Sequence, residues 1–407
     1  MSQTEVQLIK NGAVVDADIN GMSSSKLSGA LPAISGASLT NLPASGKVRN
    51  LVINGAMIVA QRATNYLGAV ASSTSSGYNL FDRWQVNHSV QASPTTAQAD
   101  VASGTSPYTL GFRKALKITN GNQSSGATAS TIFYIRQFIE SQDIATSGWN
   151  YTDPNSKITL SFWIKSSVAQ SFHGHLRSRD GTSQRYPFQT GALTADTWTK
   201  ITKTIPGNSN LQFDTDTTTN AADRGLDVVI CPYMGTTYSS SSATFDQWQA
   251  NANENFAGTD MTTTWYTTNA STLEFTGFQL ELGSSASAFA VESYAETLRK
   301  CQRYLFKITM GINSVFYFRS FHRFSGSTGQ AYHAIDFPVQ MRADPSFTQD
   351  GTAYDASGYT GAAILQNAFK GSTALKSTNS VAANGNLYLR CNNTSGSFLN
   401  LLFSAEL

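Results

Sequence analysis

Short stretches of alternating apolar and polar residues run through most of this chain. In residues 158–165, Ile158, Leu160 and Phe162 fall on one face of an extended strand, and polar or amphipathic residues fall on the other. Further strand-like runs occur at 115–118, 132–135, 198–205, 226–230 and 273–280. Many short strands separated by polar turns predict an all-β fold, with a jelly-roll β-sandwich over residues 50–292.

The first 49 residues have a different pattern and predict an extended arm. Asn11-Gly12 lies between two short apolar runs, and residues 16–48 form a quasi-repeat rich in Gly, Ser and Pro that excludes a regular helix. One chain cannot bury the regularly spaced Leu and Ile residues, whereas three parallel chains can point them at a shared axis. We therefore expect an arm that attaches to a larger assembly and trimerises; the alternative is a flexible linker. The expected contact residues are Val6, Leu8, Leu27, Leu31, Ile34, Leu39 and Leu42.

Helical spacing is clearest at residues 293–306, which predict a short connecting helix. Ser293 and Glu296 form a capping-box pattern, and Tyr294, Leu298, Cys301 and Leu305 fall on one face. A shorter helix is expected near 136–140. Residues 307–407 then predict a C-terminal β domain, with strands at 315–324, 332–337, 387–390 and 398–403.

Composition narrows the function classes. Only 13% of the 407 residues are charged and the net charge is +2, so no strong field points to nucleic acid or membrane. No apolar run is long enough to span a membrane, and the N-terminus lacks the pattern of a secretory signal, so we expect synthesis in the cytoplasm without secretion. Cys231, Cys301 and Cys391 have no paired spacing and are expected to be free, buried thiols.

Catalytic patterns are missing from the sequence. It contains no phosphate-binding loop, no Cys-x-x-Cys pair and no Gly-x-Ser-x-Gly elbow. The neighbouring acids Asp214/Asp216 and Glu254/Asp260 lie in polar loops, with nothing to indicate the separation that a glycosidase needs. We expect a protein that is not an enzyme and has no cofactor.

Three groups of residues are candidates for binding. His173, His175 and Arg177 share a strand face with Arg179, which suggests a metal site, a contact with acidic glycan, or simply a solvated basic face. Trp149, Tyr151, Trp265 and Tyr266 lie in polar surroundings, where they either stack on sugar rings or cover the edge of the core. In the C-terminal domain, the candidates for receptor contact or for packing within a trimer are Tyr317, Arg319, His322, Arg323 and Tyr388.

Two separated motifs resemble a known family. The first is the stretch 50–62, NLVINGAMIVAQR, followed by YNLFDRW at 78–84; the second is GFQLELGS at 277–284, followed by SYAETLRKCQRY at 293–304. Together they resemble jelly-roll domains of bacteriophage tail-fibre and virion structural proteins, which look like carbohydrate-binding modules. The resemblance implies that 50–62 is the first strand and that 78–84 is a strand locked onto it. It also implies a structural calcium near 50–62 and 279–281, although Ala56 stands where an acidic ligand is expected.

The resemblance, read with the arm, predicts a virion fibre subunit that is homotrimeric. Its arm would attach to a tail or capsid protein, and its body would bind bacterial surface polysaccharide without catalysis, with weak contacts strengthened by multivalency. Nucleic acid and membrane insertion are not expected. Two alternatives remain at this point: a head-fibre or decoration protein without receptor specificity, and a polysaccharide depolymerase.

Overall fold

The structure is a computed structural model, and all of its described residues belong to one compact unit. The described residues are 50–63, 65–67, 74–78, 80–90, 92, 94–123, 126–213, 224–240, 243–310, 315–316, 319–325, 328–350, 353–355, 364–366, 371–376, 389–391 and 399–406. The arm contacts predicted at Val6 to Leu42 lie outside this range, as does the acidic pair Asp214/Asp216.

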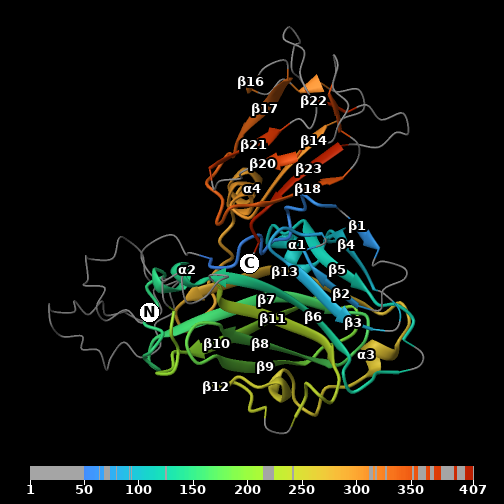
Figure 1. Ribbon diagram of the computed structural model, residues 1–407. Coiled ribbons are helices and arrows are strands. Elements are labelled where there is room, and N and C mark those ends of the chain that lie inside the picture. The colour runs from blue at the N-terminus through green and yellow to red at the C-terminus, as the bar shows by residue number, and fades with distance from the viewer. Residues whose placement is uncertain are drawn as a thin grey trace, which may run out of the picture. The chain divides into compact units, whose positions relative to one another are not determined.

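Two antiparallel sheets form the sandwich and confirm the all-β prediction (Figure 1). The six-stranded sheet has the order β1 (Asn65–Leu67), β4 (Thr95–Asp100), β5 (Lys114–Thr119), β13 (Thr272–Leu282), β7 (Lys157–Ser166) and β10 (Thr199–Pro206). The seven-stranded sheet has the order β12 (Gln249–Ala250), β9 (Gln184–Ala192), β8 (Ser171–Ser178), β11 (Arg224–Met234), β6 (Ile132–Glu140), β3 (Gln85–Ser89) and β2 (Thr74–Gly77).

The main hydrophobic core lies between these two sheets. In β7, Ile158, Leu160 and Phe162 are fully buried, as their alternation predicts. The ring of Phe162 stacks on Phe278 from β13 at 4.7 Å, and Trp84 lies 4.6 Å from the same phenylalanine. The Phe162 ring also lies 6.5 Å from that of Phe188 in β9, so side chains from both sheets meet in one layer, which leaves the other face of the seven-stranded sheet for polar residues.

The described helices are short. They are α1 (Ser106–Thr109), α2 (Ser141–Ala145), α3 (Thr264–Thr267), the 3₁₀ turn η4 (Asn253–Asn255) and α4 (Tyr294–Gln302). In α4 the capping box between Ser293 and Glu296 is confirmed, but Tyr294 is exposed, and the buried residues are Thr297 and Cys301. The helix ends before Leu305, which lies at the start of the next strand.

Two local predictions are wrong. The helix expected near 136–140 is the second half of β6, which continues to Glu140, and α2 begins only after it. The stretches 50–62 and 78–84 form turns instead of regular strands. Asn54 and Met57 have positive φ angles, which a strand does not allow, and Leu51 N and Gly55 O still hydrogen-bond to β13.

Three smaller sheets make up the C-terminal part. Their orders are β14 (Leu305–Met310), β23 (Leu399–Ser404) and β18 (Ser346–Asp350); β15 (Val315–Phe316), β22 (Leu389–Cys391) and β19 (Ala353–Asp355); and β16 (Arg319–Ser325), β17 (Thr328–Asp336), β21 (Ser372–Lys376) and β20 (Ile364–Gln366). Ile335, Phe337, Leu401 and Phe403 form a separate small core. Strands occur within each stretch predicted in this region, but the stretch 315–324 contains two strands, β15 and β16, which lie in different sheets. The division into domains stays a prediction.

Candidate functional site

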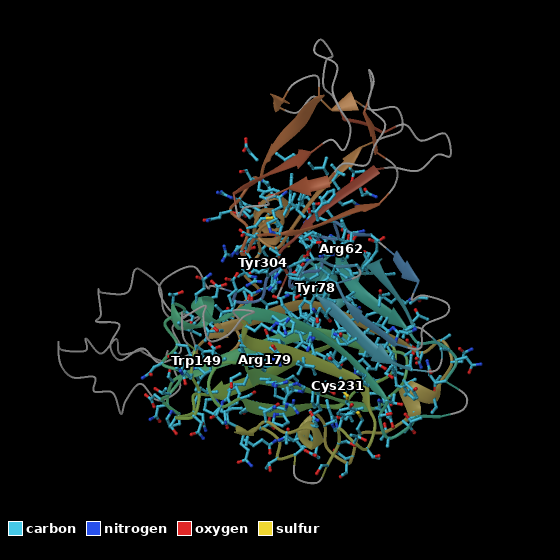
Figure 2. All side chains as sticks on the ribbon, in the orientation of Figure 1. Arg62, Tyr78, Trp149, Arg179, Cys231 and Tyr304 are labelled. Atoms are coloured by element: carbon cyan, nitrogen blue, oxygen red, sulfur yellow. The ribbon has the colours of Figure 1, made fainter. Side chains whose placement is uncertain are left out.

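The outer face of the seven-stranded sheet, opposite the core, carries the polar side chains of β8, β11 and β6. Phe172 and Leu176 of β8 point into the core, so His173, His175 and Arg177 point outward. Hydrogen-bond register places Arg177 beside Asp227 of β11, and Asp227 beside Phe138 of β6. Residues far apart in the chain thus form one continuous surface, on which Arg179 and Cys231 are labelled in Figure 2.

Segment 235–262 covers one half of this outer face. Phe256 packs edge-on against the ring of His175 at 5.0 Å, and the guanidinium of Arg185 lies 3.7 Å from the Phe256 ring centre. The backbone NH of Gly258 donates to Nδ1 of His173 at 3.1 Å. Both histidines are therefore buried, and the alternative of a solvated basic face at His173 and His175 is wrong.

The buried histidines do not form a metal site among the described residues. Burial lowers the pKa of His175 well below its ordinary value and also lowers that of His173, even though Asp260 lies 3.5 Å from the His173 ring. Both rings are therefore neutral at pH 7 and act as packing partners for the covering segment. Within the described part of the chain, no three His, Cys, Asp or Glu side chains come together.

The other half of the outer face is open and strongly basic. Arg136, Arg177, Arg179 and Arg224 are partly exposed here. Phe138 lies beneath three of them, with its ring centre 4.4 Å from the guanidinium of Arg136, 4.2 Å from that of Arg224 and 5.5 Å from that of Arg179. We call these four arginines with Phe138 and Asp227 the arginine face.

Asp227 is the acidic member of the arginine face. Its Oδ2 accepts two hydrogen bonds from Arg179, one of them from Nε at 2.7 Å. Its Oδ1 is buried and accepts no hydrogen bond from the described residues. A buried acceptor of this kind is usually satisfied by an ordered water.

Burial and repulsion between neighbouring arginines lower the pKa values of several of these side chains. Burial and then the neighbouring Arg179 lower the pKa of Arg177, and burial and then Arg136 lower that of Arg224. Burial, with Arg177 next, lowers the pKa of Arg185 to about 9. The like charges are thus held together by the fold at a cost that an anion on this face would relieve.

The aromatic candidates for sugar stacking are mostly part of the core. Trp149, Trp265 and Tyr266 are buried, at 3%, 0% and 1% exposure, so the prediction that they are available to stack on sugar is wrong. The indole NH of Trp265 donates to the carbonyl of Thr272 at 3.0 Å, which satisfies it inside the protein. Tyr151 is half-buried and packs edge-on against Phe213 at 5.0 Å. These residues cover the core edge, which was the alternative interpretation.

The C-terminal candidates remain predictions. Arg319, His322 and Arg323 lie on β16, but the structure does not describe their side chains, and Tyr317 and Tyr388 fall outside the described residues. Of the original binding candidates, only Arg177 lies on the open part of the outer face. Arg136, Arg224 and Asp227 were missed, although the alternation of Tyr134, Arg136 and Phe138 in the sequence was a usable signal.

The family-like motifs meet in a buried polar network, which we call the motif network. Asn54 donates to the carbonyls of Val59 and Asp82, and the Asp82 carboxylate accepts from the backbone and side chain of Gln61. Arg83 is fully buried, with its Nη1 2.6 Å from Oε2 of Glu406.

The motif around Tyr304 completes this network. The guanidinium of Arg83 lies 3.4 Å from the centre of the Tyr304 ring, and Tyr304 and Arg303 both hydrogen-bond to Glu140. Figure 2 shows Tyr304, Arg62 and Tyr78 in this region, where Arg62 lies 5.4 Å from the Tyr78 ring centre. The buried residues of the motif network therefore join distant segments of the fold.

The residues near the implied calcium site do not fit a cation. Nε2 of Gln279 donates to Oε1 of Glu281 at 2.8 Å, and it lies 3.3 Å from both the hydroxyl of Ser287 and the carbonyl of Ala288. Oε1 of Gln279 accepts from the NH of Ala290, which fixes the amide orientation. The amide nitrogen thus occupies the point where these oxygens converge, so the calcium suggested by the family resemblance has no place among these residues.

A separate apolar pocket lies beside the first motif. It has a volume of about 120 Å³ and is lined by side chains that include Ala56, Phe112 and Phe289, with the exposed Leu110 and Val291 at its rim. This is well below the roughly 300–1,000 Å³ typical of small-molecule sites. The arginine face is therefore the stronger candidate.

Comparison with known proteins completes the description. No protein-family model matches the chain, and no curated protein matches its sequence. Among solved structures, a xylanase fragment with a carbohydrate-binding module from Clostridium thermocellum aligns at 10% identity over 47% of this chain and 26% of its own, with a TM-score of 0.23. Tailspike protein 4 of bacteriophage CBA120 aligns at 10% identity over 57% of this chain and 21% of its own, with a TM-score of 0.28.

A third solved structure covers more of both chains. The baseplate tripod of bacteriophage Tuc2009 aligns at 12% identity over 72% of this chain and 82% of its own, with a TM-score of 0.25. The chain spans about a quarter or less of the length of the xylanase and the tailspike. Because all three TM-scores are below 0.5, the functional argument rests on the site. In the described part of the chain, no helix is long and apolar enough to cross a membrane.

Proposed function

We propose that this protein binds a surface polysaccharide through the open half of its seven-stranded sheet. The observation that carries the proposal is the arginine face itself: several guanidinium groups gather beside the buried ring of Phe138 on the outer side of the sheet. Sugars present many oxygen atoms that accept hydrogen bonds, and the arginines supply donors for them.

The assembly that would display this face is a virion fibre. The resemblance of the 50–84 and 277–304 motifs to phage fibre and virion proteins supports a subunit that trimerises and attaches through residues 1–49 to a tail or capsid. Three copies on one fibre would strengthen contacts that are individually weak. The mass of the purified full chain in solution tests the trimer directly.

The proposal is binding without hydrolysis. Asp227 is held by Arg179, and a glycosidase requires two carboxylates about 5–9 Å apart across the bound sugar. Incubation of the full chain with the polysaccharide that it binds, followed by measurement of released reducing ends, tests this point. Release above that of a heat-inactivated sample would make the protein a depolymerase.

The central experiment measures binding of the fluorescently labelled full chain to susceptible bacterial cells before and after periodate oxidation of their glycans. We expect binding that periodate removes, and an Arg177→Ala variant that binds at least tenfold less. The matched control is the double variant Lys117→Ala/Lys200→Ala, which removes two positive charges from the six-stranded sheet. Binding that resists periodate would contradict the proposal, and no binding to any susceptible cell would favour a structural virion protein.

A further inference from the structure

The charge on the arginine face is unbalanced. Five arginines, including the covered Arg185, lie on the outer side of four neighbouring strands, and Asp227 is engaged by Arg179. The charges of Arg136 and Arg177 lie on this partly exposed surface, which the low net charge of the chain does not predict. Such a cluster of positive charges, in a chain with so few charged residues, favours a negatively charged partner.

The guanidinium groups of Arg136 and Arg177 are each fixed by one hydrogen bond and retain further donors for an anion. Arg136 donates through Nε to Oε1 of Gln85 at 2.8 Å, and Arg177 donates through Nε to the hydroxyl of Ser183 at 3.1 Å. Neither forms an ion pair with a described carboxylate. Each therefore keeps its two Nη groups for a ligand, and this is the pair of donors that fits carboxylate or phosphate.

Aromatic rings limit how much the Arg136 side chain can move. The guanidinium of Arg136 lies 4.4 Å from the Phe138 ring centre and 5.3 Å from the Tyr134 ring centre. An arginine held against aromatic rings and by Nε loses less conformational freedom when it binds an anion. The face is consequently organised for anions before any ligand arrives.

We propose that the ligand is an acidic polysaccharide, whose carboxylate or phosphate groups are bound by Arg136 and Arg177. This inference rests on the proposed function, since it names the class of glycan that the same face takes. The anion supplies countercharge to the two arginines, neither of which is paired with a described carboxylate.

The test compares acidic polymers with neutral counterparts, using the full chain. The probes are polygalacturonate against its methyl ester for carboxylate, and glycerol-phosphate teichoic acid against dextran for phosphate. We expect at least about tenfold tighter binding to one acidic member at 0.15 M NaCl, because a hydrogen bond to a charged group has that effect. Binding should also weaken between about 0.1 M and 1 M NaCl as the charges are screened.

Substitutions at Arg136 and Arg177 test whether these residues cause the preference for acidic polymers. Arg136→Gln and Arg177→Gln should each weaken binding to the acidic polymer about tenfold or more, with unchanged melting temperature, while Lys117→Ala/Lys200→Ala binds like the wild type. Equal binding to the neutral polymers, no binding to either acidic polymer, or equal binding to any polyanion, including duplex DNA, would overturn the inference. Cell binding that is lost after periodate but shows no acidic preference would leave the proposed function standing and refute only this inference.

Discussion

Replacing Glu406 with leucine should destabilise the protein more than most surface changes. The side chains of Arg83 and Glu406 are 1% and 7% exposed, and Nη1 and Oε2 are 2.6 Å apart. Removal of one partner leaves the other charge buried, which typically costs about 3–5 kcal/mol of unfolding free energy. Arg83 keeps its bond to the carbonyl of Phe138 at 2.6 Å, so we expect a loss near the lower end of that range.

The assay is urea unfolding followed by tryptophan fluorescence and circular dichroism, for the full chain. The control is Glu292→Leu, whose ion pair with Lys300 is largely exposed and should contribute at most about 1 kcal/mol. The double variant Arg83→Leu/Glu406→Leu should lose less stability than the sum of the single changes, because it leaves no unpaired charge. A loss for Glu406→Leu that matches the control, or strict additivity in the cycle, would refute the account of this pair.

Three further predictions concern the motif network and the helix that follows the sandwich. Burial raises the pKa of Asp82 to about 6, so its contribution to stability is fully present below the unfolded pKa of about 4 and is lost as pH rises through 6. Asp82→Asn should therefore raise the melting temperature more at pH 8 than at pH 4.5, and equal shifts would contradict this. Gly55→Ala should lower the melting temperature, because the new Cβ meets a backbone carbonyl of β13, whereas Gly371→Ala enters open space and should not. Ser293→Ala should cost about 1 kcal/mol in urea unfolding by losing the cap on the NH of Glu296, and Ser293→Asp should restore it.

The sandwich was predictable because the alternation of apolar and polar residues can be recognised within a single strand. In β7, every second residue from Ile158 to Ile164 is apolar and buried, and no knowledge of neighbouring strands is needed to see this. The strand expected at 50–62 rested on the family resemblance, and the apolar runs at 51–53 and 56–60 do not alternate with polar residues. Asn54 redirects it: its side chain bonds Ile58, Val59 and Asp82, and closes a turn that a count of apolar residues does not reveal.

The candidate site was less predictable because it depends on register between distant strands. Arg136 and Arg177 belong to β6 and β8, which are separated by β11 in the sheet, and only the strand order brings them to the same face. Conversely, the polar neighbours of Trp265 suggested exposure, yet its indole NH is bonded to a backbone carbonyl within the core. The residues next to Trp265 in the sequence are polar and suggest a loop, whereas the burial of its side chain results from the packing of the two sheets.

The division between the motif network and the arginine face explains what the family resemblance can and cannot specify. Asn54, Asp82, Arg83 and Tyr304 are buried and bonded to one another or to nearby backbone, so they belong to the frame of the sandwich. Arg177 lies on an open strand face and can change without disturbing that frame. Proteins that share the motifs can therefore share the sandwich while differing at the outward positions of β6, β8 and β11, which is where substitutions that change the proposed ligand preference are expected.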